Sequence, residues 1–163
     1  MEKVRLGVIG LGKMGTGHIG NILAGKCPEI EVTAVADINP AKFAWATEHI
    51  PAAKQFNTGE EMMDSGLVDA VLICVPHYFH PPLAIAAMKR GLHVMSEKPA
   101  GVYTKQVKEM NEQAKKSNVV FGLMFNQRTN PVFRKMREIV QSGEMGEIRR
   151  TSWIITSWYR AQA

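Results

Sequence analysis

The sequence has few cysteines, few aromatic residues and no long hydrophobic run. Its only cysteines, Cys27 and Cys74, form no CxxC pair, which excludes that kind of redox or metal site and fits a reducing compartment. The longest apolar run, residues 70–75, is far too short to span a bilayer. The N-terminus has no basic segment followed by a long apolar one, so no export signal is indicated. We expect a cytoplasmic protein that does not contact a membrane, with Cys74 as a buried free thiol.

Charge is the second guide to function. The formal net charge is +5, and residues 97–163 hold 12 Lys and Arg against 6 Asp and Glu. A basic segment is compatible with nucleic-acid binding. However, aromatic residues make up only 7 % of the chain and none alternates with a basic run, as a base-stacking surface requires. Lys108 and Lys116 flank Glu112 at helical spacing, so we expect a solvated helix face and no nucleic-acid partner.

Short β-rich runs alternate with helix-length segments through most of the chain. This alternation is typical of a parallel sheet covered by helices on both faces. The fold class expected is therefore α/β, with a Rossmann-type doubly wound parallel sheet over residues 1–125. The six expected strands are residues 4–10, 31–37, 54–56, 69–76, 92–96 and 119–125.

The remaining residues, 126–163, differ in kind. Asn130 and Pro131 begin a helix that Gly143 ends, and residues 147–159 predict one long strand rich in aromatic and β-branched residues. One helix and one strand do not complete a domain. We expect them to be the start of a second, α+β domain, apparently truncated, with the strand covered either by a partner chain or by residues of a longer protein.

A glycine-rich loop follows the first expected strand. Gly10, Gly12 and Gly15 have the G-x-G-x-x-G spacing, in which the first glycine permits a tight turn, the second lets a pyrophosphate approach the backbone, and the third allows the helix to pack closely. The amides and positive dipole end of the following helix would then face the phosphates, near Lys13 and Met14. Glycine is common, so this pattern alone is weak evidence.

Asp37 strengthens the prediction. It ends the second expected strand, where an acid accepts hydrogen bonds from the adenine ribose hydroxyls. The alternative is an aspartate that only starts the turn at Asn39. Ile38 follows, with no Arg or Ser beside it to hold a 2′-phosphate, and a carboxylate repels that phosphate. NAD is therefore expected as cofactor rather than NADP.

Two further loops leave the carboxyl ends of strands, where ligands bind in this fold. After residues 69–76, Val75, Pro76 and His77 are expected near the ribose and nicotinamide, and His80 either orients the next helix or touches the cofactor. No third ligand accompanies the two histidines at a recognisable spacing, so we expect no metal site.

The other loop begins with Glu97, Lys98 and Pro99. Pro99 favours an extended backbone at Lys98 and so directs its side chain. An ammonium there can stabilise the alkoxide that develops on a carbinol during oxidation, and Glu97 can hold the lysine or bond the nicotinamide carboxamide. The alternative is a weakly stabilising surface ion pair. Local spacing alone does not choose between them.

The order of these motifs, with "VPHYFHPP", "EKP" and "FNQR", resembles the glucose–fructose oxidoreductase / inositol dehydrogenase / rhizopine-catabolism (Gfo/Idh/MocA) family over essentially the whole chain. The resemblance implies that Lys98 lies beside nicotinamide and substrate as a catalytic residue. It also implies that "FNQRTNP" crosses into the second domain, where Asn126 and Arg128 either line the cleft or form a hinge. His77 departs from the asparagine common in the family.

The resemblance further implies an NAD(P)-dependent oxidoreductase that transfers a hydride between a nicotinamide cofactor and a sugar, cyclitol or related polyol. It also implies a homo-oligomer that forms through the sheet of the second domain. A catalytic histidine is expected beyond residue 163, and none of the five histidines present lies in the matching segment. The residues expected at the cofactor are Gly10, Gly12, Lys13, Met14, Gly15, Asp37, Ile38, Val75, Pro76, His77, His80, Glu97, Lys98 and Asn126.

Two other functions stay open at this point. One is a non-catalytic dinucleotide-binding module or regulatory subunit without the catalytic domain, and the other is a small reductase of another Rossmann type. Trp153, Trp158, Tyr159 and Arg160 either pack in the last expected strand or contact a substrate or second subunit. We expect catalysis from the full-length protein, whereas activity of residues 1–163 alone stays undecided.

Overall fold

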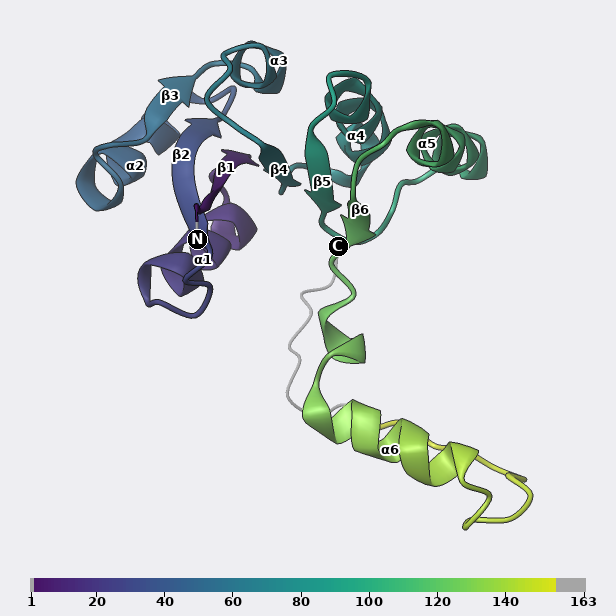
Figure 1. Cartoon of the computed structure of the whole chain (residues 1–163). Coiled ribbons are helices and arrows are strands. Elements are labelled where there is room, and N and C mark those ends of the chain that lie inside the picture. The colour runs from purple at the N-terminus through teal and green to yellow at the C-terminus, as the bar shows by residue number, and fades with distance from the viewer. Residues whose placement is uncertain (1, 155–163) are drawn as a thin grey trace, which may run out of the picture. The chain divides into compact units, whose positions relative to one another are not determined.

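The computed structural model describes residues 2–154, which fall into two units, 2–124 and 125–154 (Figure 1). The first unit is built on one six-stranded sheet in the order β3-β2-β1-β4-β5-β6. All five strand pairs are parallel. This order is typical of dinucleotide-binding α/β folds and confirms the doubly wound sheet.

The elements of the first unit follow the expected alternation, and their bounds differ from the sequence-based ranges by a few residues. The strands are β1 (Val4–Ile9), β2 (Ile30–Ala36), β3 (Lys54–Phe56), β4 (Ala70–Ile73), β5 (His93–Ser96) and β6 (Phe121–Leu123). The helices are α1 (Lys13–Leu23), α2 (Phe43–His49), α3 (Gly59–Met63), α4 (His80–Lys89) and α5 (Thr104–Lys116). Short 3₁₀ turns at Pro40–Lys42 and His77–Phe79 lead into α2 and α4.

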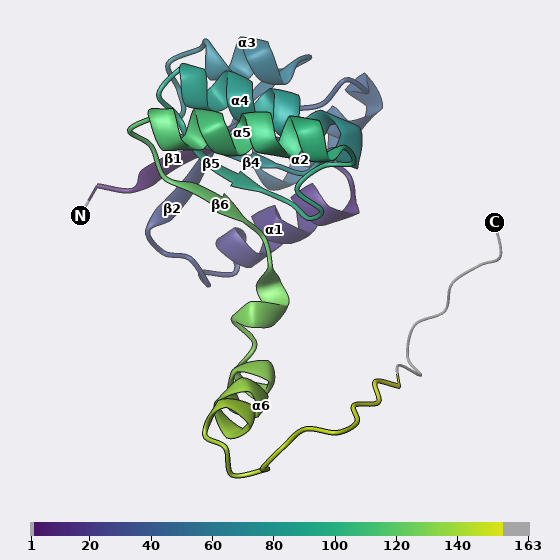
Figure 2. The same ribbon diagram turned by 90° about the vertical axis from the view of Figure 1, so that its right-hand side faces the viewer.

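Helices cover both faces of the sheet. Figure 2 shows α4 and α5 on one side of the strands and α1 on the other. On the first side, Met62 of α3, Ala84 of α4 and Met110 of α5 join one apolar core. On the second, Ile19 of α1 and Ala46 of α2 join another. The sheet is thus buried on both faces, and ligands can reach it only along its edges.

The sheet contains a switch in strand order next to β1. The chain crosses from β1 to β2 on one side and later returns to β4 on the other, and β1 pairs with both. The connections at the carboxyl ends of β1 and β4 therefore diverge, and in doubly wound folds ligands bind in a crevice at this point. The loops after β1, β2, β4 and β5 all emerge along this edge, so the fold brings the predicted site residues of the first unit to one side.

Two glycines allow α1 to begin close to β1. Gly10 has φ +95°, and a Cβ there would meet the carbonyl of Cys74 at the end of β4. A Cβ on Gly15, in the first turn of α1, would collide with the carbonyl oxygen of Gly10. Both positions therefore require glycine for reasons internal to the protein.

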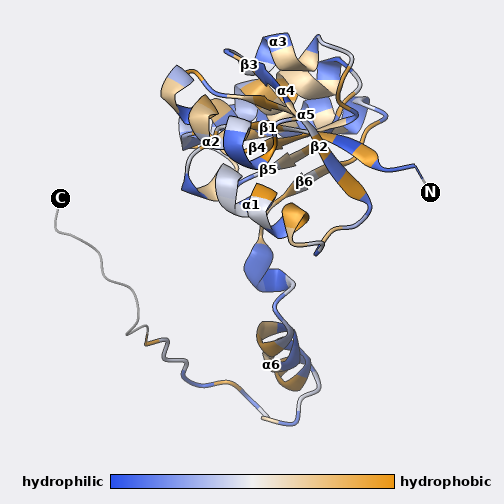
Figure 3. Cartoon of the chain, turned by 90° about the vertical axis from the view of Figure 1, so that its left-hand side faces the viewer, coloured by the Kyte–Doolittle hydropathy of each residue, from blue (hydrophilic) through white to orange (hydrophobic). Residues whose placement is uncertain are grey.

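The second unit contains α6 (Pro131–Gln141), preceded by a 3₁₀ turn at Asn126–Arg128. The Asn130 side chain caps α6 by accepting a hydrogen bond from the Val132 amide at 2.9 Å, as its position predicts. Figure 3 shows hydrophobic and hydrophilic residues on different sides of this helix. Val132, Met136 and Val140 are about half exposed or more.

The strand predicted over residues 147–159 is wrong for the residues that can be assessed. Residues 147–154 form neither helix nor strand, and residues 155–159 lie outside the described residues, as do Trp158, Tyr159 and Arg160. A strand needs a neighbour for its backbone groups, and the described part of the second unit offers none, whatever the β propensity of the side chains. Trp153 instead stacks on Phe133 of α6, with ring centroids 5.5 Å apart.

Among the residues described, no helix is both long and apolar enough to cross a membrane.

The close approach of α1 to β1 predicts unequal costs for two alanine substitutions. Gly15→Ala should lower the free energy of unfolding by about 1–3 kcal/mol, because its methyl group forces α1 away from Gly10. Gly12→Ala should cost less than about 1 kcal/mol, because Gly12 has φ −76° and open space beside it. Urea unfolding of the two variants measures both values, and equal losses would contradict the packing described here.

Candidate functional site

The loop between β1 and α1 leaves space and hydrogen-bond donors for a ligand. A Cβ on Gly12 would meet no atom within 4 Å, so nothing inside the protein requires glycine at this position. No side chain caps the N-terminus of α1. Its first amides and its positive dipole end are therefore available to an anion, and Gly12 leaves the approach unobstructed. Lys13 and Met14 are exposed on the first turn of this helix.

Asp37 ties the end of β2 to this loop. Its Oδ2 accepts a hydrogen bond from the Leu11 amide at 2.7 Å, and its Oδ1 accepts one from the Asn39 amide at 2.8 Å. The turn-starting role considered as the alternative is therefore real, but so is a contact with the glycine loop. An ionised carboxylate has about four acceptor positions, so Asp37 retains capacity for ribose hydroxyls.

A shallow hollow lies between the glycine loop and α2. Its lining includes Gly12, Lys13, Lys42 and Trp45. Next to Asp37, Ile38 is 89 % exposed, which is unusual for an isoleucine and leaves an apolar surface beside this carboxylate. This arrangement can receive an adenosine group, with the ribose at Asp37 and an apolar contact for the base.

The loop after β4 contains three of the predicted residues and leads into α4. Val75 is partly buried, whereas Pro76 and His77 are exposed. His80 is different, because its side chain is almost completely buried and both ring nitrogens contact backbone carbonyls. Neither nitrogen of His80 is left to bind a metal ion.

The loop after β5 places Glu97 inside the protein and Lys98 outside. Glu97 is 5 % exposed, its Oε1 lies 2.8 Å from Nε2 of His18 on α1, and its Oε2 accepts a hydrogen bond from the Lys98 amide at 3.1 Å. The surface ion pair considered as the alternative is not observed. Glu97 holds the backbone of Lys98 rather than its ammonium.

The Lys98 side chain is exposed, and its ammonium takes part in none of the ion pairs found among residues 2–154. The Lys98–Pro99 peptide bond is cis. An anchored backbone with an unpaired ammonium suits a group that acts on a bound molecule, because the donor is positioned without being used.

Asn126 belongs to the second unit, where it begins the 3₁₀ turn, and its carbonyl accepts a hydrogen bond from the Thr129 hydroxyl at 2.8 Å. Its contact with a cofactor stays a prediction. Arg128 lies over the Phe125 ring, 5.3 Å from the centroid.

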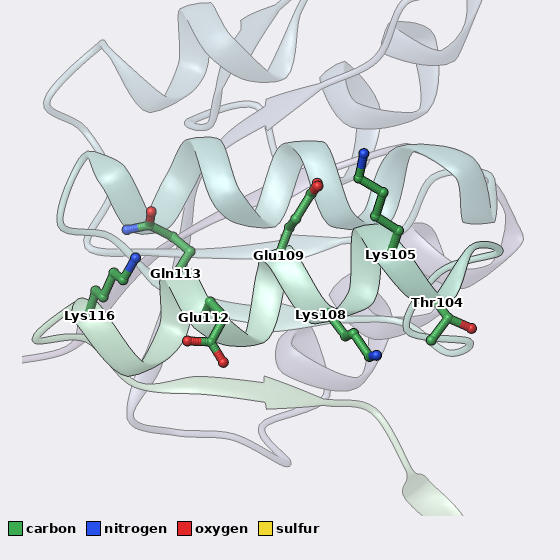
Figure 4. A pocket seen from close by; sticks show the side chains of 7 residues that line it. All are labelled: Thr104, Lys105, Lys108, Glu109, Glu112, Gln113 and Lys116. Atoms are coloured by element: carbon green, nitrogen blue, oxygen red, sulfur yellow. The ribbon is translucent and has the colours of Figure 1, made fainter.

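Another hollow lies along α5 and is lined by polar and charged side chains such as Lys105, Lys108 and Glu109. Figure 4 shows these side chains spreading to both sides of the helix rather than converging. Glu112 Oε1 lies 2.8 Å from Nζ of Lys115, and this hydrogen bond lowers the pKa of the Glu112 carboxyl. The partner of Glu112 is therefore at i+3 and not at the expected i±4 positions, Lys108 and Lys116. This surface has the character of a solvated helix face.

The motifs and the sheet order agree with a comparison against known protein families. The sequence model of the Gfo/Idh/MocA family, described as an oxidoreductase family with an NAD-binding Rossmann fold, matches residues 4–125. The chain belongs to this family. The resemblance suggested by "EKP" and the glycine loop is thereby confirmed.

Related Gfo/Idh/MocA proteins include several named inositol dehydrogenases. The inositol 2-dehydrogenase of Corynebacterium glutamicum (strain R) is 33 % identical over 150 residues, which are 90 % of this chain and 44 % of that protein. The myo-inositol 2-dehydrogenase of Thermotoga maritima is 33 % identical over 144 residues, 88 % of this chain and 42 % of the relative. The chain thus spans less than half the length of these relatives.

Solved structures of the family give the same result. One of them is scyllo-inositol dehydrogenase from Lactobacillus casei with bound NAD(H) and scyllo-inositol. The match covers 90 % of this chain and 43 % of the dehydrogenase chain, with a TM-score of 0.84 and 29 % sequence identity. The WlbA dehydrogenase from Bordetella pertussis, in complex with NADH and UDP-GlcNAcA, matches 89 % and 44 % with a TM-score of 0.82 at 28 % identity.

Sequence reasoning missed one member of the site, His18. It lies three residues after Gly15, so helical spacing places it near the same face of α1. That spacing was a usable signal, but its partner Glu97 is 79 residues away and could not be identified from local pattern.

Cys74, at the end of β4, yields a prediction about thiol reactivity. Both cysteines are free and partly buried, and burial raises the pKa of the Cys74 thiol to about 12, with the Glu97 carboxylate adding to the shift. In a Cys27→Ser variant at pH 8, Cys74 should react with iodoacetamide at least about a hundredfold more slowly when folded than in urea, because the thiolate is the nucleophile.

The matched control is Cys74→Ser, which leaves Cys27 to report on reagent and conditions. Equal alkylation rates for folded and unfolded Cys74 would show that the thiol is not shielded as described.

Proposed function

We propose that this chain forms the NAD-binding part of a dehydrogenase that oxidises a hydroxyl group of a cyclitol, sugar or related polyol. The single observation that carries the proposal is the open space over Gly12 beside the uncapped N-terminus of α1. Gly10 and Gly15 are explained by packing, whereas no neighbouring atom requires glycine at position 12, and a ligand that must approach the backbone there accounts for it. NAD as the cofactor agrees with the family to which the chain belongs.

The residues of the first unit divide the binding task by position. The amides of α1 and the Gly12 backbone suit the pyrophosphate, and the Asp37 carboxylate suits the adenine ribose hydroxyls. Val75, Pro76 and His77 border the part of the crevice that leads from β1 towards β5. When bound, NAD supplies a hydride acceptor at its nicotinamide ring.

Lys98 is proposed as the catalytic residue within this unit. Its ammonium donates a hydrogen bond to the substrate hydroxyl and stabilises the negative charge that develops on oxygen as the proton leaves. Glu97 fixes the Lys98 backbone, and the contact between Glu97 and His18 connects this carboxylate to α1, whose N-terminus is the proposed pyrophosphate site. The base that takes the proton is not assigned to any residue described here.

The substrate class rests on the relatives. Two of the similar solved structures hold a cyclitol, scyllo-inositol, and a nucleotide-linked sugar acid, UDP-GlcNAcA, and both molecules carry several hydroxyl groups. A homo-oligomer formed through a second domain is part of the same proposal. A dinucleotide-binding module without catalysis is the competing function, and the role of Lys98 separates the two.

Titration with NADH and NADPH, followed by fluorescence and energy transfer, tests the cofactor half. NADH should bind to the wild-type chain, and Gly12→Val should weaken binding by at least about a hundredfold, because its side chain fills the pyrophosphate approach without disturbing the fold. Asp37→Ala should weaken the binding of NADH and reduce the ratio of the NADH affinity to the NADPH affinity. Equal NADH binding by wild type and Gly12→Val would remove the glycine loop from the site.

Substitution of Lys98 tests the catalytic half. In the full-length protein supplied with NAD and myo-inositol or another polyol, Lys98→Met should lower kcat by about a hundredfold or more while changing the dissociation constant of NADH far less. NADH absorbance reports turnover. Full turnover by Lys98→Met would contradict the proposed role, and binding of NADH without turnover by any wild-type preparation would favour the non-catalytic module.

A further inference from the structure

His80 connects the two loops that leave β4 and β5. It opens α4, is 1 % exposed, and its Nδ1 lies 2.7 Å from the carbonyl oxygen of Pro99 while its Nε2 lies 2.8 Å from that of Val75. Val75 follows β4, and Pro99 directly follows Lys98. One buried ring therefore touches the backbone on both sides of the proposed nicotinamide end of the crevice.

The chemistry of these contacts makes His80 a donor. Carbonyl oxygens only accept hydrogen bonds, so a ring with one N–H donates to one of the two carbonyls and a ring with two donates to both. A hydrogen bond in a buried position is costly to remove, because the carbonyl left behind has no water to replace the lost donor. A hydrogen bond donated by Nδ1 to the Pro99 carbonyl would restrain the loop after β5 in this way.

Lys98 is consequently held on both sides along the chain. Its amide donates to the Glu97 carboxylate, and the carbonyl of the next residue, Pro99, contacts His80. Two residues further on, a Cβ on Gly101 would lie 2.7 Å from Cγ of Pro81, so this part of the loop also packs tightly against the start of α4. Between these anchors, the Lys98 side chain is exposed, and it takes part in none of the ion pairs found among the described residues.

We propose that His80 is a positioning residue that sets the direction of the Lys98 side chain by holding the Pro99 carbonyl against the exit of β4. The inference rests on the proposed function of Lys98. It differs from direct cofactor contact by His80, because both ring nitrogens already face protein carbonyls and the ring has almost no exposed surface.

NMR of the chain labelled with ¹³Cε-lysine observes Lys98 directly. The Lys98 signal is assigned as the one that is absent from the spectrum of Lys98→Arg. Spectra of wild type, His80→Gln and His93→Gln are recorded with and without saturating NADH. His93→Gln is the matched control, because His93 lies at the other end of β5 and its Nδ1 accepts a hydrogen bond from the Val120 amide.

In wild type and His93→Gln, NADH should shift a single Lys98 signal. In His80→Gln the shift should be lost or the signal split, and the Lys98 amide should exchange with solvent about tenfold faster, the equivalent of one lost hydrogen bond. A Lys98 shift and amide exchange in His80→Gln equal to those in the control would overturn the positioning role.

Two outcomes separate this inference from the function on which it rests. If NADH binds but leaves the wild-type Lys98 signal unmoved, the proposed role of Lys98 fails, while faster amide exchange in His80→Gln still supports the restraint. If His80→Gln does not fold, ¹⁵N-histidine spectra of the wild type decide, because the proposal requires a proton on Nδ1 of His80. A bare Nδ1 would refute it.

Discussion

The site depends on the close approach of α1 to the end of β1. A side chain at Gly15 would strike the Gly10 carbonyl, so the first turn of α1 can lie directly against the strand only because both residues are glycine. This approach fixes where the α1 amides point, and it brings the Leu11 amide within 2.7 Å of Asp37. The proposed phosphate and ribose contacts are therefore consequences of one packing constraint.

The same constraint extends to the far side of the crevice. Because α1 lies close to the sheet, His18 on its second turn reaches the buried carboxylate of Glu97, which in turn holds the Lys98 amide. A helix moved outward by a larger residue at position 15 would break this sequence of contacts. The proposed cofactor site and the proposed catalytic lysine are thus connected through α1, although their residues are far apart in sequence.

The sequence predicts the parts of this arrangement that depend on local pattern. The alternation of apolar runs with helix-length segments is sufficient to predict the six parallel strands. The spacing of Gly10, Gly12 and Gly15 is sufficient to predict the loop after β1, because the three glycines lie close together in the sequence. Side-chain partners are different. Nothing local pairs His18 with Glu97, and the spacing of His77 and His80 gave no sign that His80 would turn inward to two carbonyls.

The tail shows the limit of propensity. Residues 147–154 have the composition of a strand but form none in the described structure, because pairing requires a neighbour that composition does not supply. By contrast, the α6 cap at Asn130 was predictable, since the donor and acceptor are two residues apart. Sequence reasoning succeeded where the interaction was local and failed where a distant partner decides.

A crystal structure of this chain with NADH tests the proposed site most directly. The pyrophosphate is expected over Gly12 at the N-terminus of α1, the adenine ribose at Asp37, and the nicotinamide beside Lys98 with the Glu97–His18 contact intact. NADH bound away from Gly12, or with its nicotinamide remote from Lys98, would contradict the proposed site.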